Sequence, residues 1–302
     1  AARLPRGAPA GDPDRMSRHR AGTGAPVTRG MQVLLVVAAV LVFLAGFQLT
    51  VFPTRSADWF SWTIDVPMTA VFLGAAYWSS AVLEVAGARS RTWGRARLTV
   101  WTVLVFTVLT LVVTLVHLDK FHLGAEHPDS ARAITWGWLV IYAGVPVAMV
   151  VGLVLQARAG GAQAVDVVRL PAGLRWLLVG LAALLLATGA ALLLAPEWAA
   201  DAWAWPLTPL TARAIGAWLV GLGWASAHAR LVDDRESVRP VGLTGAAFVV
   251  LEAVALLRYG DALDWSGWQA AAYVVGLAWI AVVSAWILAL RAAGAGERGS
   301  SR

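Results

Sequence analysis

The chain has 302 residues, of which 59% are hydrophobic and only 14% are charged. It contains no cysteine, which excludes structural disulfides, thiolate metal sites, iron–sulfur clusters and covalently attached c-type haem. Its net charge is +6, but the basic residues lie in short loops without a nucleic-acid-binding motif, so we expect no nucleic-acid partner.

Apolar runs dominate the chain from residue 31 onward. Residues 1–30 are rich in Pro, Gly and Arg without periodicity, which predicts a disordered cytoplasmic tail. Crossing a bilayer takes about 20 apolar residues of helix. Eight runs meet this length, at 31–52, 67–87, 98–118, 134–157, 174–195, 208–229, 240–259 and 268–291. The sequence therefore predicts an all-α, polytopic transmembrane helix bundle, with residues 158–173 as a cytoplasmic linker and 292–302 as a second cytoplasmic tail.

The basic residues are distributed unevenly between the two sides that eight spans would create. Of the 24 Lys and Arg residues, 19 fall in the tails or in the loops after the second, fourth and sixth runs. Cytoplasmic loops carry an excess of Lys and Arg. We therefore expect both termini in the cytoplasm and a multi-pass protein of a bacterial-type cytoplasmic (inner) membrane, with the lipid bilayer as its main partner.

The second half of the chain repeats the first. A constant shift of 142 residues pairs 67–119 with 209–261, and 13 of these 53 positions are identical without a gap. Identities in the loops carry more weight than identities among Leu and Val. The pattern predicts two tandem four-helix repeats, 31–157 and 174–291. Because four is an even number, both repeats have the same orientation, as in transporters with parallel repeats.

A loop after the first run recurs after the fifth. The repeated positions are Asp58, Trp62 and Pro67 in the first loop and Asp201, Trp205 and Pro209 in the second. One interpretation is a short turn whose Trp rings anchor in the headgroup layer, with each Pro in the first turn of the next helix. The alternative is a paired, outward-facing site on the axis between the repeats.

Apart from arginines in the first or last two positions of a run, three charged side chains fall inside the apolar runs. Glu252 lies about 18 Å along its run, at a rise of about 1.5 Å per residue. A carboxylate at that depth is costly and usually functional. Arg213 is expected at a similar depth, so the two either form an ion pair or Glu252 carries protons or cations. Glu84 lies nearer the cytoplasmic end of its run.

Three histidines fall within the 13 residues from His117 to Asp129. His117, His122 and His127 are five residues apart, a spacing that does not suit ligands on one helix, which are three or four apart. Folded as a loop, they and Asp119 are candidate ligands for a divalent metal; the alternative is a solvated outer loop. We predict no other cofactor.

The sequence contains none of the common hydrolase or phosphate-loop motifs, and its loops are short. Parallel repeats and an intramembrane Glu favour a translocator of small solutes or ions, or a subunit of one. One alternative is a non-catalytic membrane scaffold or partner protein. The other is a membrane enzyme that acts on lipid at the outer face, using Asp58, Asp201 and the histidine loop.

Overall fold

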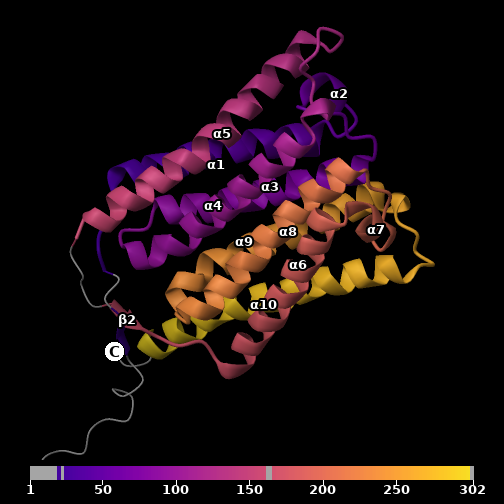
Figure 1. Cartoon of the computed structure of the whole chain (residues 1–302). Coiled ribbons are helices and arrows are strands. Elements are labelled where there is room, and N and C mark those ends of the chain that lie inside the picture. Colours follow the sequence, from indigo (N-terminus) through magenta and orange to yellow (C-terminus); the bar gives the residue numbers. More distant parts are fainter. Residues whose placement is uncertain (1–18, 22–23, 161–164, 300–302) are drawn as a thin grey trace, which may run out of the picture.

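A computed structural model describes residues 19–21, 24–160 and 165–299, and it is a bundle of long helices (Figure 1). All eight apolar runs lie in helices. These are α1 (Arg29–Val51), α3 (Pro67–Ala88), α4 (Trp93–Val116), α5 (Asp129–Arg158), α6 (Ala172–Leu194), α8 (Pro209–Val232), α9 (Arg235–Tyr259) and α10 (Trp268–Gly299). Seven of them, all except α8, are long and apolar enough to cross a membrane. The chain is therefore a multi-pass membrane protein, and the prediction of a helical membrane bundle is confirmed.

Helix α8 has 24 residues but, unlike the other seven, no stretch of membrane-spanning length that is apolar enough to count as a candidate span. It contains Arg213, His228 and Arg230, together with several Gly, Ala and Ser residues. It packs against α6 and α4, and more than half of its residues are buried. A helix that other helices cover needs less apolar side-chain surface than one that faces lipid.

Short elements separate the long helices. Helices α2 (Ser56–Trp59) and α7 (Pro196–Asp201) lie at one end of the bundle (Figure 1), which we call the tryptophan-rich end after Trp59, Trp62, Trp203 and Trp205. Two 3-10 turns follow α4 and α9, at Leu118–Lys120 and Gly260–Ala262. Strands β1 (His19–Ala21) and β2 (Val165–Val167) pair antiparallel, with Arg20 opposite Asp166. The strands are a small addition to a fold that is otherwise helical.

The order of elements in the first half recurs in the second: a long helix, a short helix, two long helices, a 3-10 turn and a last long helix. Within the halves, α1 packs on α3 and α6 packs on α8. Between the halves, α3 packs on α9 and α4 packs on α8. The centre of the bundle is therefore formed by two helices from each half. Both α3 and α8 begin with a Pro in the first turn, as predicted for Pro67 and Pro209.

The opposite end of the bundle, which we call the arginine-rich end, carries the α3–α4 and α8–α9 turns and the chain that leads into α6. The carboxylates of the α8–α9 turn bind this incoming chain. Asp233 Oδ1 accepts from the Leu170 N–H at 3.2 Å, and Asp234 Oδ1 accepts from the Val168 N–H at 3.2 Å. Asp234 also caps α9, because its Oδ2 accepts from the Ser237 N–H at 3.0 Å.

Part of the expected N-terminal tail makes defined contacts. The Gln156 side chain of α5 donates to the Pro26 carbonyl at 2.8 Å and accepts from the Thr28 N–H at 2.9 Å. The Val27 N–H donates to the Arg91 carbonyl at 3.2 Å. Residues 24–28 therefore differ from the disorder we expected, because their backbone groups find partners on α5 and the α3–α4 turn. Residues 1–18, 22–23, 161–164 and 300–302 lie outside the described part of the chain.

Candidate functional site

Glu252 occupies the interior of the bundle and bonds to a tyrosine. Its exposed fraction is 0%. The Tyr273 hydroxyl of α10 donates to Glu252 Oε2 at 2.5 Å, while Glu252 Oε1 has no hydrogen-bond partner among the described residues. A carboxyl group in this position either holds a proton or leaves a charge that only a phenol compensates.

Aromatic rings surround the Tyr273 side of this pair. The ring centroids of Trp205, Trp203 and Phe72 lie 5.1, 6.0 and 6.5 Å from that of Tyr273. Phe248, one turn before Glu252 on α9, packs on Phe72 at 5.6 Å. The polarizable but largely apolar surroundings strengthen the bond between the two oxygens.

Tyr273 also lines a groove between α6, α7 and α10. The groove has a volume of about 420 Å³ and is apolar apart from a few groups, among them Thr188, Gln269 and the tyrosine itself. Trp198 and Trp268 at its mouth are 70% and 64% exposed. Pockets of about 300–1,000 Å³ with a few polar groups are typical of small-molecule sites. The groove and the buried carboxyl are thus joined through a single phenol.

Arg213 does not pair with Glu252, so the ion-pair interpretation is wrong. The Arg213 Nε donates to the Leu193 carbonyl at the end of α6 at 3.0 Å, and its NH1 lies 2.7 Å from His117 Nε2. Arg213 is on α8, which packs on α4 and α6, whereas Glu252 is on the part of α9 that meets α10. A cation at the carboxyl end of a helix is favoured by the helix dipole and by the last free carbonyls.

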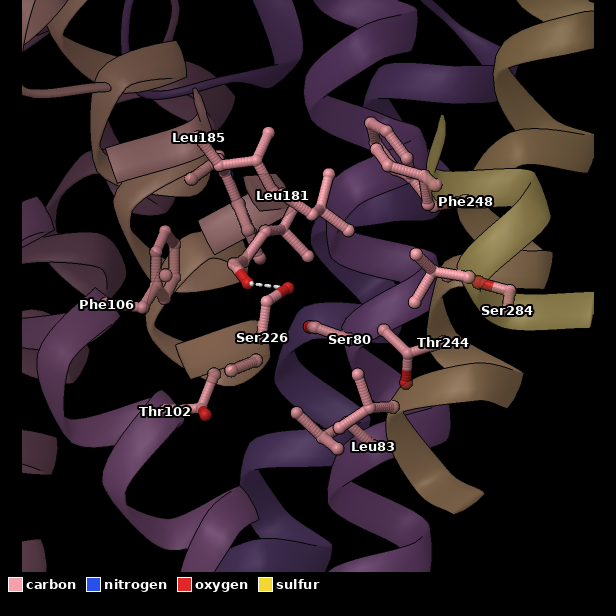
Figure 2. A pocket seen from close by; sticks show the side chains of 18 of the residues that line it. Ser80, Leu83, Thr102, Phe106, Leu181, Leu185, Ser226, Thr244, Phe248 and Ser284 are labelled. Carbon is pink, nitrogen blue, oxygen red and sulfur yellow. Dashed lines mark hydrogen bonds between the residues drawn. The ribbon is translucent and has the colours of Figure 1, made fainter. Parts of the chain in front are cut away.

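Glu84 is the second buried carboxyl. Its exposed fraction is 2%, and its Oε2 has no partner among the described residues. Although it lies near the end of α3, it does not reach the surface. It lines a small cavity at the centre of the bundle, together with residues of both halves. Figure 2 shows other residues of this cavity, among them Ser80, Thr102 and Thr244.

The repeated loop residues are not brought together as a site. Asp58 forms an exposed ion pair with Arg55 at 3.2 Å, and Asp201 ends α7 on the surface. Trp62 and Trp205 are buried rather than anchored in a headgroup layer, with exposed fractions of 3% and 2%. Each joins a separate aromatic cluster, because the loop folds back over the helix ends and covers its own Trp.

The histidine loop is divided between two places. His122 is buried, its Nδ1 lies 2.9 Å from the Phe60 carbonyl and its Nε2 lies 3.0 Å from Thr63 Oγ1. The ring of His127 lies beside it, tilted by 38° with the ring centroids 4.4 Å apart, whereas His117 contacts Arg213 instead. Asp119 pairs with the neighbouring Lys120. In the described ranges no three His, Cys, Asp or Glu side chains gather as metal ligands would.

Sequence reasoning missed Tyr273 as a functional residue, although one signal pointed to it. Between Gln269 and Ser284 it carries the sole side-chain hydroxyl in an otherwise apolar run. A lone hydroxyl on a membrane helix needs a partner on another helix or on its own backbone. Pairing that hydroxyl with the lone carboxyl of the preceding helix would have identified the contact.

No family model matches the chain, and no curated protein or solved structure matches it either.

Proposed function

We propose that this membrane protein translocates a small solute or ion, or is a subunit of such a system, and that the Glu252–Tyr273 pair takes up and releases a proton during the cycle. The observation that carries the proposal is a fully buried carboxyl whose bonded partner is a neutral phenol. Ionisable groups inside membrane helices usually mark proton or substrate routes.

The groove gives the proposal a place for a solute. Tyr273 faces the groove on one side and Glu252 on the other, so a solute that hydrogen-bonds to the phenol would compete for the same hydroxyl. The aromatic and aliphatic lining favours a largely apolar solute with one polar group. The solute competes for the Tyr273 hydroxyl, and the proton binds the Glu252 carboxyl, so both act on the Tyr273–Glu252 hydrogen bond. Binding of the solute and binding of the proton are therefore coupled.

We also propose that all eight long helices span the membrane as two parallel repeats. The shared order of elements supports this, as do the equivalent contacts of α3 with α9 and of α8 with α4. With α8 included, the arginines at 89–97, 158–175 and 230–239 share one end of the bundle. By the positive-inside rule that end faces the cytoplasm of a bacterial-type inner membrane, with both termini on the same side.

The two other hypotheses find less support. A scaffold held by polar stripes needs hydroxyls that bond across helices, and Thr99 of α4 does donate to the Leu83 carbonyl of α3, as Trp138 of α5 does to Thr114 of α4. These contacts leave the buried Glu252 carboxyl without a role, which the translocator proposal supplies. An enzyme acting on lipid needs a catalytic cluster, and Asp58, Asp201 and the histidines do not gather among the described residues. A membrane protein partner is compatible with the translocator proposal, since a subunit needs one.

Proton flux into vesicles tests the proposal. Purified protein is reconstituted around a pH-sensitive dye, and a proton gradient is imposed. We expect the wild-type flux to exceed that of empty vesicles, and Glu252→Gln and Tyr273→Phe to lower it at unchanged protein content. Glu236→Gln, which changes an exposed carboxyl on the same helix, is the matched control. Folded Glu252→Gln protein with the wild-type flux would contradict the proposal.

A further inference from the structure

A small cavity lies where the two halves meet. Its volume is about 60 Å³, enough for a few water-sized occupants, since about 10–15 Å³ holds one. Side chains from α3, α4, α6, α8, α9 and α10 surround it (Figure 2). The polar ones are Ser80, Glu84, Thr102, Ser226, Thr244 and Ser284. Thr102 and Thr244 are separated by the 142 residues of the sequence repeat, as are Glu84 and Ser226.

Three of the residues that line this cavity have oxygen atoms without partners. Glu84 Oε2, Thr102 Oγ1 and Thr244 Oγ1 are buried and have no hydrogen-bond partner among the described residues. More than nine-tenths of each of these three residues is buried. Buried polar atoms are rarely left unsatisfied, so three around one cavity call for an occupant.

The hydroxyls that do have partners also offer their lone pairs. Ser80 donates its hydroxyl hydrogen to the Tyr77 carbonyl at 3.0 Å, and Ser226 donates to the Leu222 carbonyl at 3.0 Å. Figure 2 shows the second of these bonds beside the cavity. Because their hydrogens are used, these oxygens can only accept, either from water or from a cation.

The charge of the cavity is negative or zero. None of the residues that line it is Lys, Arg or His, and Glu84 is its one carboxyl. A single carboxylate among neutral oxygens balances a monovalent cation but not a divalent one. Mg²⁺ also keeps several of its waters, for which this volume has little room.

We propose that this cavity binds one Na⁺ ion, held by the Glu84 carboxylate and by hydroxyl oxygens that include Thr102 and Thr244. The cation supplies the counter-charge that Glu84 lacks and satisfies the three unpartnered oxygens at once. Glu84 is four residues from the end of α3 at Ala88, so about one helical turn separates the ion from the arginine-rich end. The site joins helices of both halves, and its occupation stabilises their contact.

Thermal unfolding of the full chain in detergent tests the site without any uptake measurement. In NaCl the Tm should lie several degrees above that in choline chloride of equal ionic strength, and it should rise with Na⁺ concentration, because the ion binds the folded state. KCl at the same concentration should stabilise less. Glu84→Gln should abolish the difference, whereas Glu236→Gln, at an exposed carboxyl outside this cavity, should retain it.

Two results would overturn the site: equal Tm values of the wild type in NaCl and choline chloride, or an unchanged Na⁺ response in Glu84→Gln. If Glu84→Gln does not fold, the double variant Thr102→Val/Thr244→Val keeps the carboxyl and removes two ligands. Its affinity for Na⁺, measured by calorimetric titration, should fall about tenfold or more, and an unchanged affinity would equally overturn the site. The site does not depend on Glu252, so its failure leaves the translocation proposal intact, and the reverse also holds.

Discussion

Gly189 on α6 and Gly216 on α8 face each other at close range. A Cβ added to either one would lie 2.8 Å from the carbonyl oxygen of the other. In the first half, the equivalent Gly74 leaves no room for a Cβ either, because one would lie 3.2 Å from the Gly46 carbonyl. Small residues allow membrane helices to approach with their backbones in contact. The first two long helices of each half therefore cross at glycines in the same positions.

Replacing Gly189 or Gly216 with alanine should destabilise the protein. The added methyl group meets backbone atoms that cannot move as a side-chain end can, and overpacking of this kind costs about 1–3 kcal/mol. Gly144→Ala on α5 is the control, because a Cβ there meets nothing within 4 Å. Thermal unfolding in detergent measures both. A loss of Tm for Gly144→Ala equal to that for Gly216→Ala would contradict the packing argument.

Removing the Tyr273 hydroxyl should reduce stability as well as proton flux. Tyr273→Phe leaves both Glu252 oxygens buried and without a donor, which costs about 1–3 kcal/mol. Replacing the carboxyl too, in Glu252→Leu/Tyr273→Phe, removes the unsatisfied group and should recover most of the loss. The two single variants and the double variant form a cycle in which a coupling free energy near zero would show that the bond contributes nothing.

Acid should loosen the loop that holds His122. Burial, and secondarily the neighbouring His127, lowers the pKa of the His122 imidazole below its ordinary value of about 6.5. The unfolded loop therefore binds the proton more readily than the folded loop. The stabilisation is complete above pH ~6.5 and is lost as the pH falls from there toward the lowered pKa.

Hydrogen exchange of the backbone amides in residues 121–128 measures this loosening. Exchange, corrected for its intrinsic pH dependence, should become less protected on the acid side of that window. In His122→Gln the same correction should leave little pH dependence. Protection in the wild type that is constant across the window would show that His122 accepts its proton without cost.

Asp234→Ala should weaken the arginine-rich end. The variant loses the cap of α9 and the bond to the Val168 N–H, and loss of a cap alone costs about 0.5–2 kcal/mol. Glu236→Ala, in the first turn of the same helix but exposed, is the control. Tm measurements should separate the two variants, and limited proteolysis should cut the chain before α6 faster in Asp234→Ala. Equal cleavage of both variants would show that Asp234 does not hold the chain that leads into α6.

The sequence was sufficient to predict the long helices, because their apolar runs have the length that a bilayer requires. It also located Pro67 and Pro209 in first turns. It could not determine which neighbouring helix a given residue faces. Arg213 and Glu252 were placed at similar depth, but they lie on helices that turn toward different partners.

The candidate site was predicted only in part for the same reason. Glu252 and Glu84 stood out because carboxyls are rare in apolar runs, and both are buried. Their surroundings depend on which helices pack together, which a single sequence does not specify. Trp62 is one example: a loop Trp suits a headgroup layer, but here the folded loop buries it against Phe60 and Trp138.

The packing of α3 on α9 and of α4 on α8 has a consequence for how the chain can be assembled. Each half covers its central helices only in part and leaves the remaining surface to the other half, so neither half has a complete interior of its own. A gene split after α5 should yield two fragments that are degraded when made singly and that accumulate when made together in one cell. We therefore expect the two halves to depend on each other in folding as the subunits of an obligate dimer do.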